Sequence, residues 1–124
     1  LVFVHRLRAQ GVDGGAIRLA VLAHHYRDDW EWTDEGLRQA QSRLDAWARA
    51  ATLPAGPAAD RLIESMRAAV ADDLDTPAAL AAVDAYAAEA LRMGGRDEDG
   101  PRRMRDAIDA LLGVDLDAVS GASN

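Results

Sequence analysis

Two adjacent histidines, His24 and His25, are the residues best suited to bind a metal ion. Neutral imidazole is the commonest nitrogen ligand of metals in proteins. Adjacent residues of a helix, however, point about 100° apart, and neither histidine has another histidine or an acid three or four residues before it. Asp28 follows His24 by four residues, but we expect it to lie beyond the end of the helix. Packing or hydrogen bonding is therefore the favoured role of both histidines, and metal binding is the alternative.

Three aspartates, Asp72, Asp73 and Asp75, could suggest a calcium loop. An EF-hand loop needs acids at alternating positions, a central glycine and a terminal glutamate, whereas this run leads into Pro77. The aspartates are better placed to stabilise the N-terminus of a helix that begins at Pro77, because anionic side chains are favourable there. A carboxylate pair for acid-base catalysis would need one buried member with a raised pKa, and the sequence indicates none.

Trp30 and Trp32 lie in a short connector, residues 26–32, and could stack on a base or a sugar. We expect them instead to anchor the connector against the core. The chain has no glycine-rich phosphate loop, no cysteine and histidine zinc set, and no serine, histidine and aspartate in a recognisable catalytic context. We therefore assign no catalytic, cofactor-binding or metal-binding residue within this chain.

The composition excludes several kinds of chemistry and favours a small helical domain. The 124 residues contain 14 basic side chains, all of them arginine, and no cysteine. Lysine-dependent chemistry, thiol nucleophiles, disulfides and thiolate zinc sites are therefore excluded within the chain. Alanine, the strongest helix former, supplies 27 residues, whereas only six are aromatic. We expect one all-α domain whose helices approach each other closely.

Negative charge is concentrated in the second half of the chain. Residues 1–62 hold eight arginines and eight acids, whereas residues 63–124 hold six arginines and thirteen acids. Nucleic-acid binding needs clustered cations, so we expect no nucleic-acid partner. No apolar run approaches the roughly eighteen residues of a membrane-spanning helix, and the apolar residues 1–4 are too few for a signal peptide. We therefore expect a cytoplasmic protein with no membrane partner.

Five helices are expected to position these residues. The first is capped by Asp13 and runs to about His25, with apolar side chains on two adjacent faces, so it should be buried on more than one side. The second begins after Thr33, its predicted N-cap, and carries Trp47 as a core anchor. It ends before residues 53–57, where two prolines disfavour helix.

The other three helices follow in the second half of the chain. The third is expected from about 58 to 71. The fourth begins at Thr76-Pro77, with the threonine as cap and the proline at the first helical position, and ends before Gly94-Gly95. A solvated loop then leads to the fifth helix, from Pro101 to Gly113. Their apolar stripes are predicted at Leu62, Ile63, Met66 and Val70, at Leu80, Val83, Ala87 and Leu91, and at Met104, Ile108, Leu111 and Leu112.

Short connectors between these helices fit an up-and-down helical bundle. The first four residues could add a short strand or an extended lead-in. The chain does not begin with methionine, so we expect a fragment or a processed chain.

The order of several short motifs resembles one known family. The motifs are Val12-Asp13, Ala16-Ile17-Arg18-Leu19, His25-Tyr26-Arg27, Trp32 and Asp72-Asp73-Leu74-Asp75-Thr76-Pro77. In cysteinyl-tRNA synthetase-like class I enzymes, a segment of the type Asp-Pro-x-x-Leu-Arg leads into a His-Tyr-Arg motif, and an Asp-Asp-x-Asn/Asp-Thr-Pro motif begins a later helix. Residues 1–115 resemble the part of these enzymes that follows the Lys-Met-Ser-Lys-Ser signature loop.

Within this family, the chain more closely resembles the amide-forming ligase branch of mycothiol biosynthesis. Residues 28–33, Asp-Asp-Trp-Glu-Trp-Thr, look like that branch's version of the stretch after His-Tyr-Arg. The chain also stops shortly after Val114, whereas the synthetases usually continue. The acidic second half suits a domain that no longer contacts tRNA, and the lysine-free composition is compatible with the GC-rich coding of actinobacteria.

The resemblance implies an enzyme that activates cysteine with ATP to cysteinyl-adenylate. The amine of glucosaminyl-inositol would then attack the carbonyl, releasing AMP and forming an amide. A zinc ion held by cysteine and histidine residues would select the cysteine thiol. All of these groups are expected before Leu1, in a missing N-terminal catalytic domain. The fragment is therefore expected to be inactive alone, with that domain as its partner, in a monomeric enzyme.

On the same resemblance, residues 1–32 are the connector that follows the signature loop and residues 33–124 are the C-terminal helical bundle. Structural residues at the joint between domains would be His25, Tyr26, Arg27, Trp30 and Trp32. Two alternatives stay open. One is the tRNA-contacting helical domain of a cysteinyl-tRNA synthetase, and the other is a stand-alone helical interaction domain.

Overall fold

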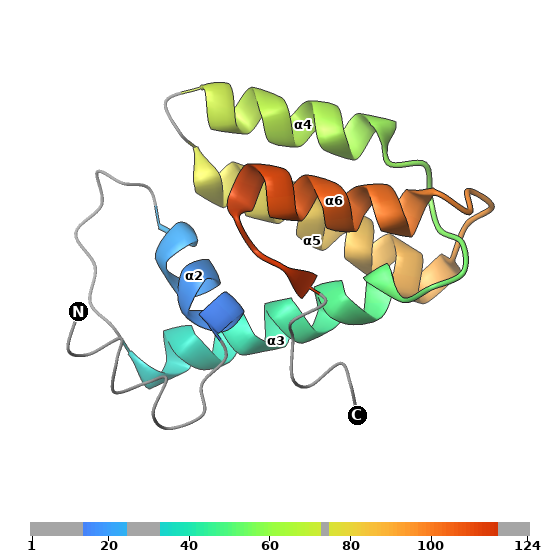
Figure 1. Cartoon of the computed structure of the whole chain (residues 1–124). Coiled ribbons are helices and arrows are strands. Elements are labelled where there is room, and N and C mark those ends of the chain that lie inside the picture. The colour runs from blue at the N-terminus through green and yellow to red at the C-terminus, as the bar shows by residue number, and fades with distance from the viewer. Residues whose placement is uncertain (1–13, 25–32, 73–74, 117–124) are drawn as a thin grey trace.

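The computed structural model describes residues 14–24, 33–72 and 75–116 (Figure 1). Within these residues the secondary structure is helical and includes no strand, which confirms the predicted all-α fold there; residues 1–4 lie outside them. No helix in the described ranges is long and apolar enough to cross a bilayer. The helices are α2 (Gly14–Leu22), α3 (Asp34–Ala51), α4 (Asp60–Ala71), α5 (Thr76–Met93) and α6 (Gly100–Leu112).

The helices form a bundle around one apolar core. α5 packs against α3 and α4, α6 packs against the same two helices, and α2 crosses the N-terminal half of α3 (Figure 1). α2 lies within the predicted connector 1–32, yet it contributes to the same core as the bundle. The division at residue 32 stays a prediction. The largest fully buried side chains include Leu19, Leu44, Trp47, Met66, Leu80, Met104 and Ile108.

α3 begins as its sequence predicts. The side chain of Thr33 caps the helix by accepting a hydrogen bond from the backbone N–H of Gly36 at 2.9 Å. Asp34 and Glu35 occupy the first turn, where negative charge is favourable. Trp47 is fully buried, which confirms its predicted role as a core anchor.

The start of α5 differs from the prediction. The N-cap is Asp75, whose carboxylate accepts a hydrogen bond from the N–H of Ala78 at 3.2 Å, and Thr76 is the first helical residue. The hydroxyl of Thr76 instead donates to the carbonyl oxygen of Leu22 at 2.8 Å, at the C-terminal end of α2. The predicted cap is wrong because a carbonyl from a distant helix offers the threonine hydroxyl a better partner than its own helix does.

Two helices differ from the prediction at single positions. α2 ends at Leu22 rather than near His25, and Val21 is 46% exposed. Leu91, predicted on the stripe of α5, is 39% exposed, and Tyr86 and Ala90 take inward positions instead. Leu80, Val83 and Ala87 are buried as predicted, so the expected face of α5 is confirmed except at Leu91.

In the second half of the chain, two helices end directly before a glycine, as predicted. α5 ends at Met93, and Gly94 has a φ of 68°. α6 ends at Leu112, and Gly113 adopts the left-handed conformation that side chains disfavour. The solvated loop predicted between the two helices is partly wrong, since Asp97 is half-buried and Gly100 is buried.

Candidate functional site

Few of the residues singled out by chemistry lie in the described part of the chain. His24 is half-buried in the turn after α2, Asp72 is exposed at the end of α4, and Asp75 caps α5. Within the ranges that the structure describes, no group of three histidine, aspartate or glutamate side chains could hold a metal ion. The other predicted residues lie outside those ranges: His25, Tyr26, Arg27, Trp30, Trp32 and Asp73.

A groove of about 490 Å³ lies between the end of α2 and the N-terminal half of α3. We call it the α2–α3 groove. Small and apolar side chains form its inner lining: Ala20, Ala23, Leu37 and Ala40. The polar residues that complete the lining are His24, Thr33, Glu35, Gln39 and Arg43. Figure 1 shows α2 lying across α3 at this place.

Charged side chains of this groove have partners inside the chain. Arg43 Nε donates to both carboxylate oxygens of Asp84 at 3.1 Å, and its Nη2 lies 2.9 Å from Oδ2. The indole N–H of Trp47 also donates to Asp84 Oδ1, at 2.9 Å. Glu35 accepts a hydrogen bond from Arg38 at 3.0 Å. Since these charges are already satisfied, the groove favours apolar contact over binding of a charged ligand.

α2 is held in place by side chains that bind helix ends. It has nine residues, which is too short for a stable isolated helix. Arg18 Nε, on α2, donates to the carbonyl oxygen of Leu112 at 2.9 Å, at the end of α6. A cation is favourable at that end of a helix. Together with the bond from Thr76 to Leu22, this contact ties α2 to both α5 and α6.

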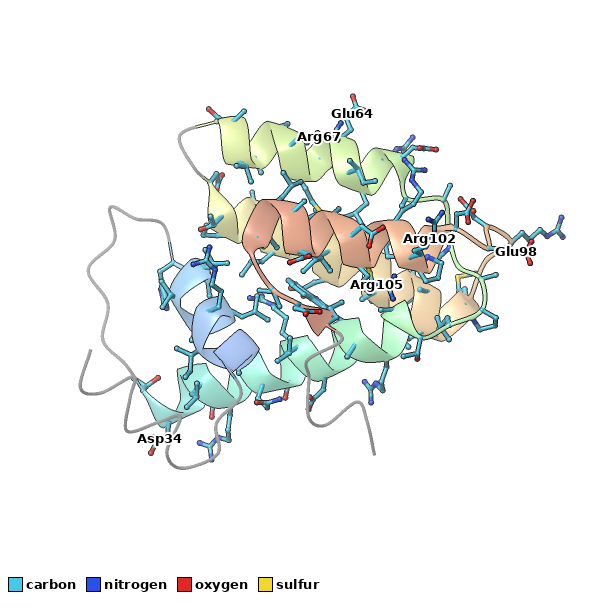
Figure 2. All side chains as sticks on the ribbon, viewed as in Figure 1. Asp34, Glu64, Arg67, Glu98, Arg102 and Arg105 are labelled. Carbon is cyan, nitrogen blue, oxygen red and sulfur yellow. The ribbon has the colours of Figure 1, made fainter. Side chains whose placement is uncertain are left out.

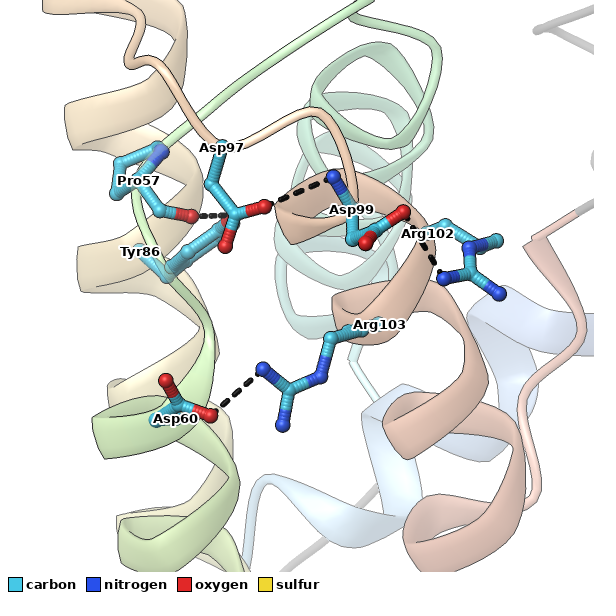
Figure 3. Close-up of polar contacts among 7 residues, drawn as sticks. All are labelled: Pro57, Asp60, Tyr86, Asp97, Asp99, Arg102 and Arg103. Atoms are coloured by element: carbon cyan, nitrogen blue, oxygen red, sulfur yellow. Dashed lines mark hydrogen bonds and ion pairs between the residues drawn. The ribbon is translucent and has the colours of Figure 1, made fainter.

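The opposite end of the bundle contains a second cluster, which we call the loop clasp: Gly56, Pro57, Tyr86 and Asp97. Figure 3 shows Pro57, Tyr86 and Asp97. Gly56 and Asp97 exchange two backbone hydrogen bonds, at 3.0 and 2.9 Å. The hydroxyl of Tyr86 donates to the carbonyl oxygen of Pro57 at 2.6 Å. Burial, followed by the nearby carboxylates of Asp97 and Glu89, raises the pKa of Tyr86 to about 12. Tyr86 therefore stays protonated and can donate throughout the physiological pH range.

Glycine is required where the clasp brings two backbones together. A Cβ atom at Gly95 would collide with the backbone of Gly56. A Cβ atom at Gly100 would collide with the carbonyl of Pro57 and lie 2.7 Å from the Tyr86 hydroxyl. The two loops can therefore pack only because these positions lack a side chain.

Ion pairs around the clasp lie on the surface. Arg103 Nη1 lies 2.6 Å from Asp60 Oδ1, and Arg102 Nη2 lies 3.0 Å from Asp99 Oδ1 (Figure 3). The hydrogen bond from Arg103 to Asp60 raises the pKa of the guanidinium above its usual value. Figure 2 shows Arg102 and Glu98 at the same end of the bundle, and Glu64 and Arg67 along α4. Positive and negative side chains are thus mixed here, unlike the clustered cations of a nucleic-acid surface.

Neither cluster combines the groups that catalysis needs. In the described residues, the Tyr86 hydroxyl is bound to a carbonyl and the Asp84 carboxylate to Arg43 and Trp47. Sequence reasoning missed both the groove and the clasp. The one available signal was Asp84, an acid within the alanine-rich stretch of α5.

No protein-family model matches the chain. Several proteins named L-cysteine:1D-myo-inositol 2-amino-2-deoxy-alpha-D-glucopyranoside ligase do match it. The one from Streptomyces avermitilis is 58% identical over 116 residues, which are 94% of this chain and 28% of that protein. The one from Saccharomonospora viridis is 57% identical over 119 residues, 94% of this chain and 29% of that protein. The chain is similar to one segment of this ligase.

The ligase from Mycobacterium sp. (strain KMS) extends the same finding, with 54% identity over 94% of this chain. The resemblance to the ligase branch, predicted from the order of motifs, is thereby confirmed. The chain spans about 28% of the length of these ligases. Activity in the named ligases belongs to proteins more than three times as long.

Proposed function

We propose that this chain is the C-terminal helical part of an ATP-dependent ligase that joins cysteine to glucosaminyl-inositol in mycothiol biosynthesis. One observation carries the proposal: 58% identity to a ligase of that specificity over 94% of the chain. In the proposed reaction, the cysteine carboxylate attacks ATP and displaces pyrophosphate, giving cysteinyl-adenylate. The amine of glucosaminyl-inositol then attacks the carbonyl carbon, AMP leaves, and an amide remains.

The ATP and zinc implied by the family resemblance do not fit the residues of this chain. The chain contains no cysteine and no lysine. The parts of it that the structure describes hold no set of three histidine or acidic side chains that could bind a metal. The proposal therefore assigns both groups to the portion of the ligase outside this chain, and it assigns no chemical step to residues within it.

The proposed contribution of the chain is structural. Arg18 and Thr76 fix α2 against the ends of α6 and α5, and α2 lies within the connector, residues 1–32, that is predicted to join the catalytic domain. The bundle would thus hold that connector in a defined position. The proposal includes a monomeric, cytoplasmic enzyme in which the N-terminal catalytic domain is the partner of this chain.

A test of this function uses the longer protein that contains the chain. We expect AMP to form only when ATP, cysteine and glucosaminyl-inositol are all present, and we expect the 124-residue chain alone to show no ATP-pyrophosphate exchange. Exchange catalysed by the pure chain would contradict the assignment of the active site. Tight binding of tRNA(Cys) by the longer protein, without amide formation, would instead support the synthetase alternative.

A further inference from the structure

We propose that Asp84 acts as an orientation lock, which fixes how α5 is turned about its own axis against α3. Three donor groups of α3 converge on its carboxylate: Arg43 Nε at 3.1 Å from both oxygens, Arg43 Nη2 at 2.9 Å from Oδ2, and the Trp47 indole N–H at 2.9 Å from Oδ1. Arg43 and Trp47 are four residues apart, so they lie one turn apart on the same face of α3. The lock consists of residues of the described bundle and is independent of the proposed function.

α5 needs such a contact because alanine occupies both its buried and its exposed side. Eight of its 18 residues are alanine. Ala79 and Ala87 are buried, whereas Ala81 and Ala85 are exposed. A small turn of the helix would exchange one alanine for another against its neighbours, with little change in buried apolar area. Packing of alanine therefore specifies the rotation of α5 only weakly.

Leu91 shows which other orientation the lock opposes. It follows Asp84 by seven residues, and seven steps of about 100° leave the two side chains within about 20° of each other around the helix. A turn that buried Leu91, which is 39% exposed, would therefore also carry Asp84 inward. Removing a carboxylate from water costs more free energy than covering the open part of a leucine gains. Asp84 thus keeps this edge of α5 near the surface, where its own side chain is 40% exposed.

A second penalty against turning α5 comes from Trp47. This side chain is fully buried, and its indole N–H uses Asp84 as an acceptor. If α5 turned, the N–H would be left in the core without that acceptor, which destabilises the folded state. By contrast, the pair of Arg103 and Asp60 joins α6 to α4 at the surface, where Asp60 is 76% exposed. Asp84 therefore differs from a surface partner, because it also binds a donor in the core.

One pair of variants of the 124-residue chain tests the lock. Asp84→Leu replaces the carboxylate by an apolar side chain, and Glu89→Leu makes the matched change at an exposed acid on the α4 side of the same helix. We expect Asp84→Leu to stay helical by circular dichroism, because apolar side chains can replace a buried ion pair without loss of stability. Its amide NMR spectrum should show a second set of α5 resonances. The second orientation should rise from below about 1% to above about 10% of the population, at least about tenfold.

Glu89→Leu should keep a single set of resonances. A single set in Asp84→Leu would overturn the proposal, and so would a second set of the same size in Glu89→Leu. If Asp84→Leu does not fold, Asp84→Asn decides the question. The asparagine amide has one acceptor oxygen in place of two, so the lock predicts a smaller second set in that variant. A single set in Asp84→Asn would then overturn the proposal.

Discussion

The two ends of the bundle are held together by different kinds of contact. At the loop clasp, two connections between helices meet backbone to backbone, and the Tyr86 hydroxyl closes the contact. At the α2 end, side chains of Arg18 and Thr76 reach to carbonyl groups at the ends of helices, beside a groove lined with alanine. The clasp has no space for a side chain at Gly95 or Gly100, whereas the α2 end leaves Ala23 and Leu37 partly exposed.

This difference indicates which end should open more easily. The clasp is held by two backbone hydrogen bonds between its loops, and glycine at positions 95 and 100 allows the loops to approach closely. α2 has only nine residues, and apart from its buried apolar residues it is held by two side-chain hydrogen bonds, so it should open more easily than the clasp.

The largest expected effect on stability comes from replacing a glycine by alanine, and it should differ between the two ends of the bundle. Gly95→Ala should lower the free energy of unfolding by about 3 kcal/mol, because the new methyl group would collide with the backbone of Gly56. Gly15→Ala in α2 should change it by less than about 1 kcal/mol. Its Cβ would meet the methyl tips of Leu44 at 3.2 and 3.4 Å, and these can move. Urea unfolding of the 124-residue chain measures both, and equal losses would remove the distinction between the ends.

Alkaline pH should weaken the clasp next. The pKa of Tyr86 is about 12 in the folded chain against an ordinary value of 10, so the folded state favours the protonated hydroxyl. The resulting stability is fully present below pH 10 and is lost as the pH rises from 10 toward 12. The chain has no lysine or cysteine to titrate in this window. The difference in urea midpoint between wild type and Tyr86→Phe should therefore shrink over that range; a constant difference would show that the hydroxyl does not stabilise the clasp.

Removing a single hydrogen bond at either end should lower the stability by a smaller amount. The increase in amide hydrogen exchange should lie in different parts of the chain in the two cases. Tyr86→Phe and Thr76→Val each remove one bond to a carbonyl, for a loss of about 1 kcal/mol. Thr76→Val should raise amide hydrogen exchange mainly in α2, because that helix depends on few tertiary bonds. Tyr86→Phe should raise exchange in both loops of the clasp. Uniform exchange increases in both variants would mean that the bundle opens only as one unit.

The smallest effect is expected for the ion pair between Arg103 and Asp60. Both side chains are substantially exposed, at 38% and 76%, and exposed pairs contribute little because water and salt screen them. Arg103→Gln should shift the urea midpoint less than Tyr86→Phe does, and the shift should diminish in 1 M salt. If Arg103→Gln shifted the urea midpoint more than Tyr86→Phe, and did so equally in 1 M salt, the ion pair would be one of the contacts that stabilise the clasp.

Local signals predicted much of the helical framework. Thr33 caps its helix, Pro101 lies in the first turn of α6, and Gly113 ends that helix in the left-handed conformation. Each of these features depends on residues within four positions of one another. The sequence did not predict that Asp75 rather than Thr76 caps α5, because both residue types are good N-caps. The Thr76 hydroxyl instead binds a carbonyl at the end of α2, a contact that local sequence does not reveal.

The candidate site was much less predictable. The α2–α3 groove exists because two helices cross where both carry alanine, and the clasp pairs Gly56 with Asp97 from a different loop. Neither arrangement has a local sequence signal. The motif order, in contrast, correctly indicated the ligase resemblance although the residues His25, Tyr26 and Arg27 lie outside the described structure.

Sequence by itself determined the helical fold, the main helix boundaries and the absence of lysine and cysteine chemistry from this chain. Those properties follow from residue type and from hydrogen bonds between near neighbours. Tertiary structure alone decided which carbonyl the Thr76 hydroxyl binds, which loops join in the clasp and where α2 leaves a groove on α3. Such features depend on how helices cross, and many distant side chains set that geometry together.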